Sequence, residues 1–580
     1  MNGNYGIWFE DSTNITISNN SVTNNNLGIF LASSGNSNLT DNTVHNNLRE
    51  GIFLIYSGNS TLINNTITKN NGTGIRLQSS GTSVLTKNSV INNRKVGILL
   101  QYSGNNVIRD NSLRNNSFSI KGDTFNHYVQ AIVASNLLND KQLVYWQHIV
   151  DDTVPSGAGM VILVNCSSII VNNQQVESII GAYCSNILLQ NNEIFNGNLG
   201  IQLIYSNACF ISENTLFNKE MAGISLEYSH HNVLTNNIIT NNHEEGILLM
   251  YSEDNILTNN RIAYNSKEGI SLQYCENNNV IGNTVASNAG VGIYIWNGDY
   301  YWSEDFYGFN NLTNNVVTDN KGIGISLECS GQSILINNTI LNNTEGLFLY
   351  CSGQNILTNN TLMDNNGTGI SLGYSKNSTI IGNSIFNNNK KGISVYFSEF
   401  CHIAANTIHD NNGIGIYLYL SSFACIITGN EVTNNSDYGI QLSISCMNNI
   451  VQYNDFLWNN LGGISQAYDD GWNNLFIYNY WNDWTSPDTN NDGIVDLAYP
   501  IEGKAFNFDP FPLAPGSQSS SSHIKPSTSL TIKVPSSTSP QGSTAFTTSP
   551  SHQSRWINLV LTSLIVIFIT IFRKRNRKTF

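Results

Sequence analysis

The chain has 580 residues and a formal net charge of −14, and only 11% of its residues are charged, against roughly 25% in a typical soluble domain. The acidic balance argues against a nucleic-acid partner, because phosphates need a basic surface. Asn accounts for 94 residues, and Asn disfavours helices. A hydrophobic content of 40% excludes a disordered polar tract. An all-β architecture therefore remains.

Residues 1–477 contain an internal repeat. Its first copies read YGIWFEDSTNITISNNSVTNN, LGIFLASSGNSNLTDNTVHNN and EGIFLIYSGNSTLINNTITKN. The Gly near the start of each copy recurs at intervals of 22 to 24 residues over most of this region, at Gly6, Gly28, Gly51, Gly74, Gly97, Gly200, Gly223, Gly246, Gly269, Gly292, Gly324, Gly346, Gly369, Gly392, Gly415, Gly439 and Gly463. Two stretches interrupt the repeat, at about 121–157 and at 296–310.

Positions within the repeat predict its fold. Counting the Gly as zero, apolar residues recur at +1, +3, +11 and +16, Ser at +6, and Asn at +14 and +19. The period of two indicates three short strands joined by bends, and no segment has the period of a crossover helix. Stacked coils would pair in parallel about 4.8 Å apart, with apolar ladders inside and inward Asn amides bonding one another. We therefore predict an all-β, single-stranded parallel β-helix of about twenty coils, roughly 90 Å long.

The repeat resembles the NosD-like, carbohydrate-binding and sugar-hydrolase (CASH) group of right-handed parallel β-helices, over about residues 1–513. Two non-repeating segments strengthen the resemblance. DKQLVYWQHIVDDTVPSGAGMVILVNCSSIIV (140–171) is similar to an insertion of archaeal surface members, and YNYWNDWTSPDTNNDGIVDLAYPI (478–501) to their closing cap. The resemblance implies a right-handed coil and an extracytoplasmic location. It implies no single activity, because this fold hosts enzymes and binding scaffolds alike.

One edge of the middle coils is the predicted binding site. Aromatic rings and carboxylates suit sugars, which offer C–H patches and hydroxyl donors. The expected contact residues share offsets +5 and +7 or lie in the 296–310 loop: Tyr205, Tyr228, Tyr251, Tyr274, Glu253, Glu276, Trp296, Tyr300, Tyr301 and Trp302. His230 precedes the two glutamates at +7. Two alternatives stay open, namely that the tyrosines only stabilise their bend, and that the edge holds a metal.

The sequence shows no catalytic constellation. A sugar-cleaving site needs two carboxylates about 5 to 9.5 Å apart. The only Asp-Asp pairs, Asp151-Asp152 and Asp469-Asp470, are expected to cap loops. Met and His are scattered, so no soft-ligand cluster for Cu(I) is indicated. We predict a protein that binds or displays glycans, with a polysaccharide-active enzyme and a surface-layer or adhesion spacer as alternatives.

The expected cap, 478–513, contains a candidate calcium loop. Asp488, Asn490, Asp492 and Asp496 match positions 1, 3, 5 and 9 of an EF-hand-type loop, with a Gly at position 6. Position 12 is Tyr499 in place of the bidentate Glu, so weak Ca²⁺ binding is predicted. The alternative is an Asx-rich turn without metal.

The C-terminal region predicts a membrane anchor. Residues 514–555 are rich in Ser, Thr and Pro and indicate a solvated stalk that is a candidate for O-glycosylation. Residues 556–572 are uncharged, and the basic residues within 573–580 should stay cytoplasmic, which puts the β-helix on the cell exterior. Because MNGNYGIWFEDS begins inside the first coil without a signal segment, we infer that the true start lies upstream or that the chain is a fragment.

The nine Cys residues cannot all pair with one another, because their number is odd. Cys329 and Cys351 share offset +5 on adjacent coils, so a bridge between them is one reading and small inward or corner side chains are the other. Sequons such as Asn38-Leu-Thr and Asn366-Gly-Thr are plentiful. Many follow from composition alone, and those on inward ladders would be inaccessible.

Overall fold

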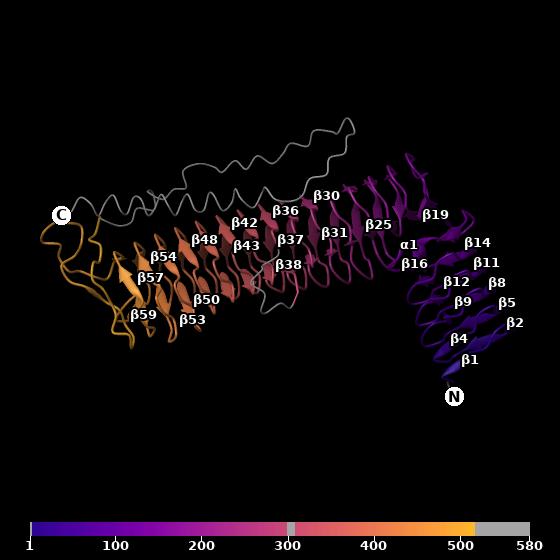
Figure 1. Cartoon of the computed structure of the whole chain (residues 1–580), viewed down its shortest axis with the longest axis horizontal. Coiled ribbons are helices and arrows are strands. Elements are labelled where there is room, and N and C mark those ends of the chain that lie inside the picture. Colours follow the sequence, from indigo (N-terminus) through magenta and orange to yellow (C-terminus); the bar gives the residue numbers. More distant parts are fainter. Residues whose placement is uncertain (1–2, 299–307, 517–580) are drawn as a thin grey trace, which may run out of the picture. The chain divides into compact units, whose positions relative to one another are not determined.

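The computed structural model describes residues 3–298 and 308–516, which form a parallel β-solenoid of about twenty turns with about 23 residues per turn (Figure 1). Within these residues the only α-helix is the four-residue α1 (Phe125–Tyr128). The predicted fold class is therefore confirmed. The stalk, the proposed anchor and the basic tail lie almost wholly outside the described residues.

Each coil contributes three short strands, as in β32 (Ile247–Met250), β33 (Ile256–Thr258) and β34 (Arg261–Ala263). They pair in parallel and in register with β35 (Ile270–Gln273), β36 (Asn279–Ile281) and β37 (Thr284–Ala286) of the next coil. Residues at equal offsets therefore lie above one another. The repeat frame thus fixes which side chains are neighbours.

Four bends per coil use left-handed backbone, at offsets +5, +8, +13 and +18. In one coil these are Tyr251, Asp254, Asn259 and Tyr264, with φ between 49° and 59°. Asn tolerates this region better than other residues with a Cβ, because its short side chain bonds the local backbone. The bends therefore explain part of the Asn excess, in addition to the inward ladders.

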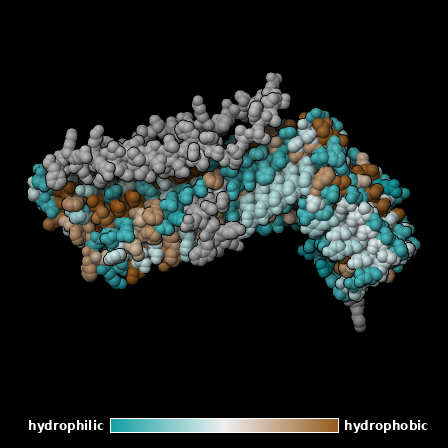
Figure 2. Space-filling model, viewed as in Figure 1, coloured by the Kyte–Doolittle hydropathy of each residue, from teal (hydrophilic) through white to brown (hydrophobic). Residues whose placement is uncertain are grey.

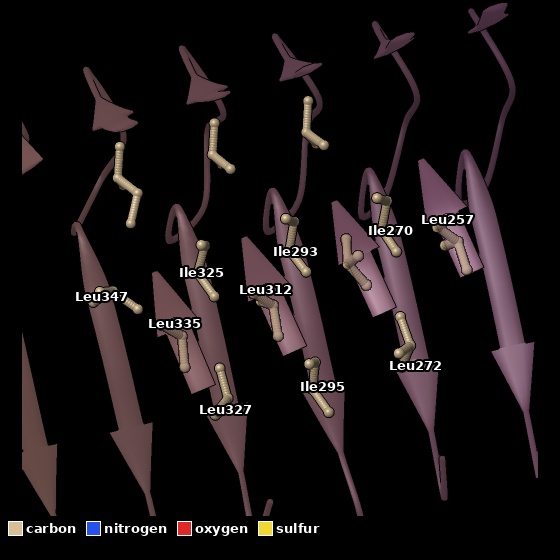
Figure 3. Close-up of a cluster of buried hydrophobic side chains, with 14 of the residues drawn as sticks. Leu257, Ile270, Leu272, Ile293, Ile295, Leu312, Ile325, Leu327, Leu335 and Leu347 are labelled. Atoms are coloured by element: carbon tan, nitrogen blue, oxygen red, sulfur yellow. The ribbon is translucent and has the colours of Figure 1, made fainter. Parts of the chain in front are cut away.

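Inward apolar side chains stack into continuous ladders (Figure 3). Ile270, Ile293 and Ile325 at +1 and Leu272 and Ile295 at +3 are all fully buried. Each full burial of such a side chain stabilises the fold by about 1.5–3 kcal/mol. Because a rung packs against the coils above and below, the ladder stabilises only stacked coils.

Inward Asn side chains form a second kind of ladder. The Nδ2 of Asn260 donates to the Leu234 carbonyl (2.9 Å) and to Asn283 Oδ1 (3.0 Å). Its Oδ1 accepts from the backbone N–H (3.0 Å) and the Nδ2 (2.9 Å) of Asn237. The buried amide is thus satisfied, which removes the cost of burying it.

The coils fall into two segments with separate hydrophobic cores. The first sheet of the N-terminal segment contains β1 (Tyr5–Glu10), β4 (Leu27–Ala32), β7 (Ile52–Ile55), β10 (Ile75–Gln78), β13 (Ile98–Gln101) and β16 (Phe118–Lys121). The second contains β2 (Thr16–Ser18), β5 (Asn38–Thr40), β8 (Thr61–Ile63), β11 (Val84–Thr86), β14 (Val107–Arg109) and β17 (Ala131–Ile132). The third contains β3 (Ser21–Thr23), β6 (Thr43–His45), β9 (Thr66–Thr68), β12 (Ser89–Ile91), β15 (Ser112–Arg114) and β18 (Leu137–Leu138).

The C-terminal segment has the same three-sheet plan. Its first sheet contains β20 (Ala158–Val164), β23 (Ile179–Ala182), β26 (Ile201–Ile204), β29 (Ile224–Glu227), β32, β35, β38 (Ile293–Trp296), β41 (Ile325–Glu328), β44 (Leu347–Tyr350), β47 (Ile370–Gly373), β50 (Ile393–Tyr396), β53 (Ile416–Tyr419), β56 (Ile440–Leu442) and β59 (Ala467–Asp469). Its second contains β21 (Ile170–Asn172), β24 (Leu188–Gln190), β27 (Phe210–Ser212), β30 (Val233–Thr235), β33, β36, β39 (Asn311–Thr313), β42 (Ile334–Ile336), β45 (Ile356–Thr358), β48 (Thr379–Ile381), β51 (His402–Ala404), β54 (Ile426–Thr428), β57 (Ile450–Gln452) and β60 (Leu475–Ile477). Its third contains β22 (Gln175–Val176), β25 (Glu193–Phe195), β28 (Thr215–Phe217), β31 (Ile238–Thr240), β34, β37, β40 (Val316–Thr318), β43 (Thr339–Leu341), β46 (Thr361–Met363), β49 (Ser384–Phe386), β52 (Thr407–His409), β55 (Glu431–Thr433), β58 (Asp455–Leu457) and β61 (Tyr480–Trp481).

The predicted interruption at about 121–157 is where the sheets change partners. Strand β19 (Lys141–Gln147) pairs antiparallel with β18 and parallel with β20. The third sheet of the N-terminal segment therefore continues into the first sheet of the C-terminal segment. This change of sheet brings residues of coils far apart in the sequence next to one another.

The C-terminal cap ends the Asn ladders with other acceptors. The cap contains the hairpin of β62 (Tyr499–Pro500) and β63 (Phe508–Asp509). Asp509 Oδ2 accepts from the N–H (2.9 Å) and Nδ2 (3.0 Å) of Asn479, the last Asn of the +14 ladder. Gln466 Oε1 does the same for Asn459, at 2.9 and 3.1 Å. Each terminal rung thus finds an acceptor without another coil.

Candidate functional site

A row of stacked aromatic rings occupies one corner of the C-terminal segment. We call this row the aromatic edge; it comprises Tyr183, Tyr205, Tyr228, Tyr251, Tyr274 and Trp296. The tyrosine ring centroids lie 4.8–4.9 Å apart, and the interplanar angles fall from 20° to 3° along the row. The +5 offset therefore predicted a continuous stack correctly.

The stacking changes how these tyrosines would meet a sugar. Both faces of Tyr205, Tyr228 and Tyr251 lie against neighbouring rings, so their edges and hydroxyls are what the row presents to solvent. Only Trp296 is turned, by 58° to Tyr274. The expected contact through stacked ring faces is thus limited to the ends of the row, whereas hydrogen bonding to the hydroxyls is available along it.

The stack also compensates for backbone strain. Every tyrosine of the aromatic edge has a left-handed φ of 48–56°. Such a conformation costs a residue with a Cβ about 1–2 kcal/mol, and aromatic pairs contribute about 0.5–1.5 kcal/mol beyond their buried area. The stabilising role that the sequence left open is therefore supported by the geometry alongside any binding role.

The polar row beside the aromatic edge is assembled as predicted. The Glu253 backbone N–H donates to His230 Nδ1 (3.1 Å), and His231 lies 3.8 Å from Asp254. Burial raises the pKa of Glu276, and repulsion by Glu253 raises it further. These groups offer hydrogen-bond acceptors for sugar hydroxyls next to the phenols. Tyr300, Tyr301 and Trp302 lie outside the described residues, so their predicted role stays a prediction.

Tyr183 belongs to the aromatic edge, but counting offsets from the repeat Gly did not predict it. Its coil starts with Ser178 in place of Gly, and the coil before it is short, as shown by the bond between Gln175 and Glu193, 18 residues apart. Phe125 of α1 packs on Tyr183 edge-on, with centroids 5.3 Å apart. The aromatic edge therefore begins at the segment junction. The available signal was the Tyr-Cys pair that aligns with Tyr-Ser in the next coil.

The cap loop with the calcium prediction is held by its own backbone. Asp488 accepts from the N–H groups of Asp492 (3.2 Å) and Gly493 (2.9 Å), and Asp496 accepts from the Thr489 hydroxyl (2.8 Å). Asn490 Nδ2 donates to Asp492 Oδ2 (3.0 Å). Across residues 3–298 and 308–516, no three His, Cys, Asp or Glu side chains are grouped to hold a metal. Calcium binding at Asp488, Asn490, Asp492 and Asp496 therefore stays a prediction.

The Asp pairs serve the structure in the way the sequence suggested. Asp469 accepts from the Gly471 N–H (2.8 Å) and from Asn474 Nδ2 (2.9 Å). Asp470 accepts from the Lys504 N–H (2.8 Å), and Asp152 from the Thr153 N–H (2.7 Å). These carboxylates hold loops and cap residues.

A charged groove at the segment junction was not predicted. This junction groove has a volume of about 680 Å³ and is lined by Glu50, Arg76, Lys121, Glu177, Gly197 and Asn198, among others. Lys219, fully buried, donates from Nζ to the carbonyls of Glu177 (2.5 Å) and Asn196. Burial raises the pKa of Glu177 and lowers the pKa of Lys219, and the attraction between the two charges opposes both shifts. The signal was Lys219 itself, which occupies the +19 offset where neighbouring coils have Asn.

Exposed apolar side chains gather on the C-terminal coils (Figure 2). They include Phe400, Ile444, Leu461, Ile464, Trp472 and Phe506. Several replace the Asn of the bends, as Phe400 does at +8 with a φ of 55°. The repeat count did not reveal this apolar surface because it follows the common residue at each offset.

Comparison with known families identifies the chain. Residues 1–142 and 147–308 match the family described as periplasmic copper-binding protein (NosD). The chain belongs to the NosD family. Residues 306–456 also match the right handed beta helix region.

Solved structures resemble this NosD-family chain in fold only. The A-module of mannuronan C-5 epimerase AlgE4 from Azotobacter vinelandii is 14% identical, over 53% of this chain and 88% of that one, with a TM-score of 0.35. A mannuronic acid specific polysaccharide family 6 lyase from human gut microbiota is 12% identical, over 57% and 84%, with a TM-score of 0.36. No curated protein matches the chain.

The described residues do not fit the copper of the family's description. Seven of the nine Cys are buried, and some take ladder positions, as when Cys184 N–H donates to Ser206 Oγ (3.0 Å). Cys329 and Cys351 meet on adjacent coils, where a hydrogen bond from Cys329 lowers the pKa of the Cys351 thiol. Since the described part of the chain also lacks a group of three or more His, Cys, Asp or Glu ligands, we assign it no copper chemistry.

Proposed function

We propose that this NosD-family chain binds or displays glycans at the cell exterior and that the aromatic edge is its contact surface. The observation behind this proposal is the uninterrupted row of partly exposed rings beside His230, Glu253 and Glu276. Phenol hydroxyls donate and accept, and carboxylates accept, so together they match the hydroxyls of a polysaccharide. Trp296 at the end of the row adds a tilted ring for a sugar face.

The proposed location rests on the sequence of the C-terminal region. Residues 556–572 are uncharged and are followed by a basic tail, which supports anchoring with the coils outside. Over residues 3–298 and 308–516, the structure contains no helix with the length and apolarity to cross a membrane. Membrane fractionation of the full chain and of a chain ending before Trp556 tests the anchor: the full chain should sediment with membranes and the shorter one should be released.

Two alternatives, a polysaccharide-active enzyme and a spacer, are separated by one experiment. The full chain is applied to a glycan array, and release of reducing ends or unsaturated uronates is measured on the same glycans. Binding without product supports the proposal, product shows an enzyme, and silence on both supports a spacer.

Variants then assign the binding surface. Tyr228→Asn and Tyr251→Asn interrupt the row with a residue that tolerates left-handed backbone. Tyr56→Asn is the matched control, because Tyr56 has the same offset and a φ of 50° in an N-terminal coil. Loss of glycan binding in the first two variants alone supports the aromatic edge; equal binding in all three contradicts it.

A further inference from the structure

The junction groove gathers charged groups in a chain that has few of them. Only 11% of all residues are charged, and the net charge is −14. The groove nevertheless brings together four basic and three acidic side chains: Arg76, Arg94, Lys95, Lys121, Glu50, Glu177 and Glu220. The local excess is therefore positive in an acidic protein.

The guanidinium of Arg76, which lines the junction groove, is held in a fixed position. Arg76 on β10 donates from Nη2 to the amide oxygens of Gln78 (2.8 Å) and Gln101 (2.9 Å), and its carbon Cζ lies 4.7 Å from the ring centroid of Phe53. Its Nη1 lies 3.4 Å from Glu50 Oε1. Arg76 Nε is buried and has no hydrogen-bond partner. The side chain is thus held in place with one donor unused.

Two carboxylates of the groove lining also have an acceptor oxygen without a hydrogen bond. Glu50 is 8% exposed, and its Oε2 has no hydrogen-bond partner, with Arg49 Nε at 3.6 Å. Glu177 Oε1, from the C-terminal segment, also has none. Three buried side-chain atoms without a hydrogen bond, those of Glu50, Arg76 and Glu177, therefore belong to residues that line this one groove. A buried polar atom left unpaired costs about 1–3 kcal/mol.

Gly197 keeps the groove open at Glu177. Its φ of 67° is left-handed, and a Cβ there would lie 2.2 Å from Glu177 Oε1. The neighbouring lining is rich in accessible amides, including Asn115, Asn139 and Asn198, while Val96 and Leu99 are its only side chains of purely apolar character. Such a surface lacks an aromatic platform for a base, whereas amides pair well with hydroxyls because both donate and accept.

We propose that the junction groove binds a segment of an acidic oligosaccharide, with the ligand's anionic group on Arg76 and Lys121 and its hydroxyls on the Asn amides and Glu177. Carboxylated and sulfated sugars share this chemistry. The groove is separate from the aromatic edge, and the proposal does not depend on the glycan contacts proposed there.

Titration calorimetry on the full chain in detergent tests the assignment. The probes are a hexamer of a uronic acid, a sulfated hexasaccharide, a neutral hexasaccharide of equal length, inorganic phosphate and a single-stranded oligonucleotide. At least one acidic sugar should bind, at least about tenfold more tightly than the neutral one, since a charge-assisted hydrogen bond contributes about 1.5–3 kcal/mol. The preferred acidic hexamer identifies a carboxylated or a sulfated ligand.

Variants make the result specific to the groove. Arg76→Gln and Lys121→Gln should each weaken the acidic sugar about tenfold. Arg109→Gln removes the same charge from an exposed position on β14 and should change the affinity less than about twofold. The Lys121→Gln variant is expected to fold, because the Lys121 side chain is only partly buried at the end of β16, so it tests the groove even if Arg76→Gln fails to fold. Equal binding of acidic and neutral sugars, tighter binding of phosphate or oligonucleotide, no binding at all, or groove variants that match Arg109→Gln would each overturn the proposal.

Discussion

Asn388 lies in the inward Asn ladder, and its neighbour Asn389 makes similar Asn–Asn hydrogen bonds on the exposed surface. The two residues therefore allow the stabilising effect of the buried bonds to be compared with that of the exposed ones. Asn388 is fully buried; its Nδ2 donates to Asn411 Oδ1 (3.0 Å) and to the Leu362 carbonyl (3.1 Å). Its Oδ1 accepts from the N–H (3.2 Å) and Nδ2 (2.9 Å) of Asn365. Asn389 donates to Asn366 (3.1 Å) and accepts from Asn412 (3.2 Å), all exposed.

Replacing each Asn by Ala should therefore have very different effects. Asn388→Ala leaves the buried N–H of Asn365 without an acceptor, at about 1–3 kcal/mol, and removes further hydrogen bonds worth about 1 kcal/mol each. The expected local destabilisation is about 3–5 kcal/mol. Asn389→Ala should cost less than about 0.5 kcal/mol, because water replaces both exposed bonds.

Hydrogen exchange measures this difference locally, which suits a solenoid whose coils contact only their neighbours. For Asn388→Ala, amide protection in residues 361–411 should fall roughly a hundredfold to a few thousandfold, by the conversion of 1.4 kcal/mol per factor of ten. Asn389→Ala should leave protection nearly unchanged. Equal effects of the two variants, or no loss in Asn388→Ala, would show that the inward ladder does not stabilise the coils.

Three further predictions concern packing, pH and the cap. Gly369→Ala should lower the free energy of unfolding by about 1–3 kcal/mol, because the new Cβ would lie 2.5 Å from Ile385 Cγ2; an unchanged thermal midpoint contradicts it. Burial lowers the pKa of His402 below its ordinary 6.5, so unfolding takes up a proton and stability should fall as pH drops below 6.5; His402→Gln should reduce this acid sensitivity in thermal melts, and an identical pH profile argues against it. Asp509→Ala should expose the cap to proteolysis at a cost of about 2–4 kcal/mol, and Asp509→Asn should cost less because one acceptor oxygen remains; equal cleavage of both refutes the acceptor role.

The repeat made the fold predictable because equal offsets become spatial neighbours. The +5 tyrosines, the +14 and +19 Asn ladders and the inward +1 and +3 residues all follow from one frame. Tyr183 did not, since its coil starts with Ser178 in place of Gly and follows a short coil of 18 residues. Neither did the change of sheet at β19, because an antiparallel pairing in one place leaves no periodic trace in the sequence.

The junction groove shows why function is hard to predict in such a chain. Within the coils, the Asn residues of the inward ladders find their partners on the next coil, so the repeat leaves few polar atoms unsatisfied. Where the sheets change partners, Lys219 replaces a ladder Asn, and Glu50, Arg76 and Glu177 retain unused hydrogen-bonding atoms. These residues line one groove only because the interruption brings the coils of Gly51 and Gly74 close to that of Ser178. A binding site of this kind depends on the residues that depart from the repeat, and the pairing of those residues is a property of the folded chain.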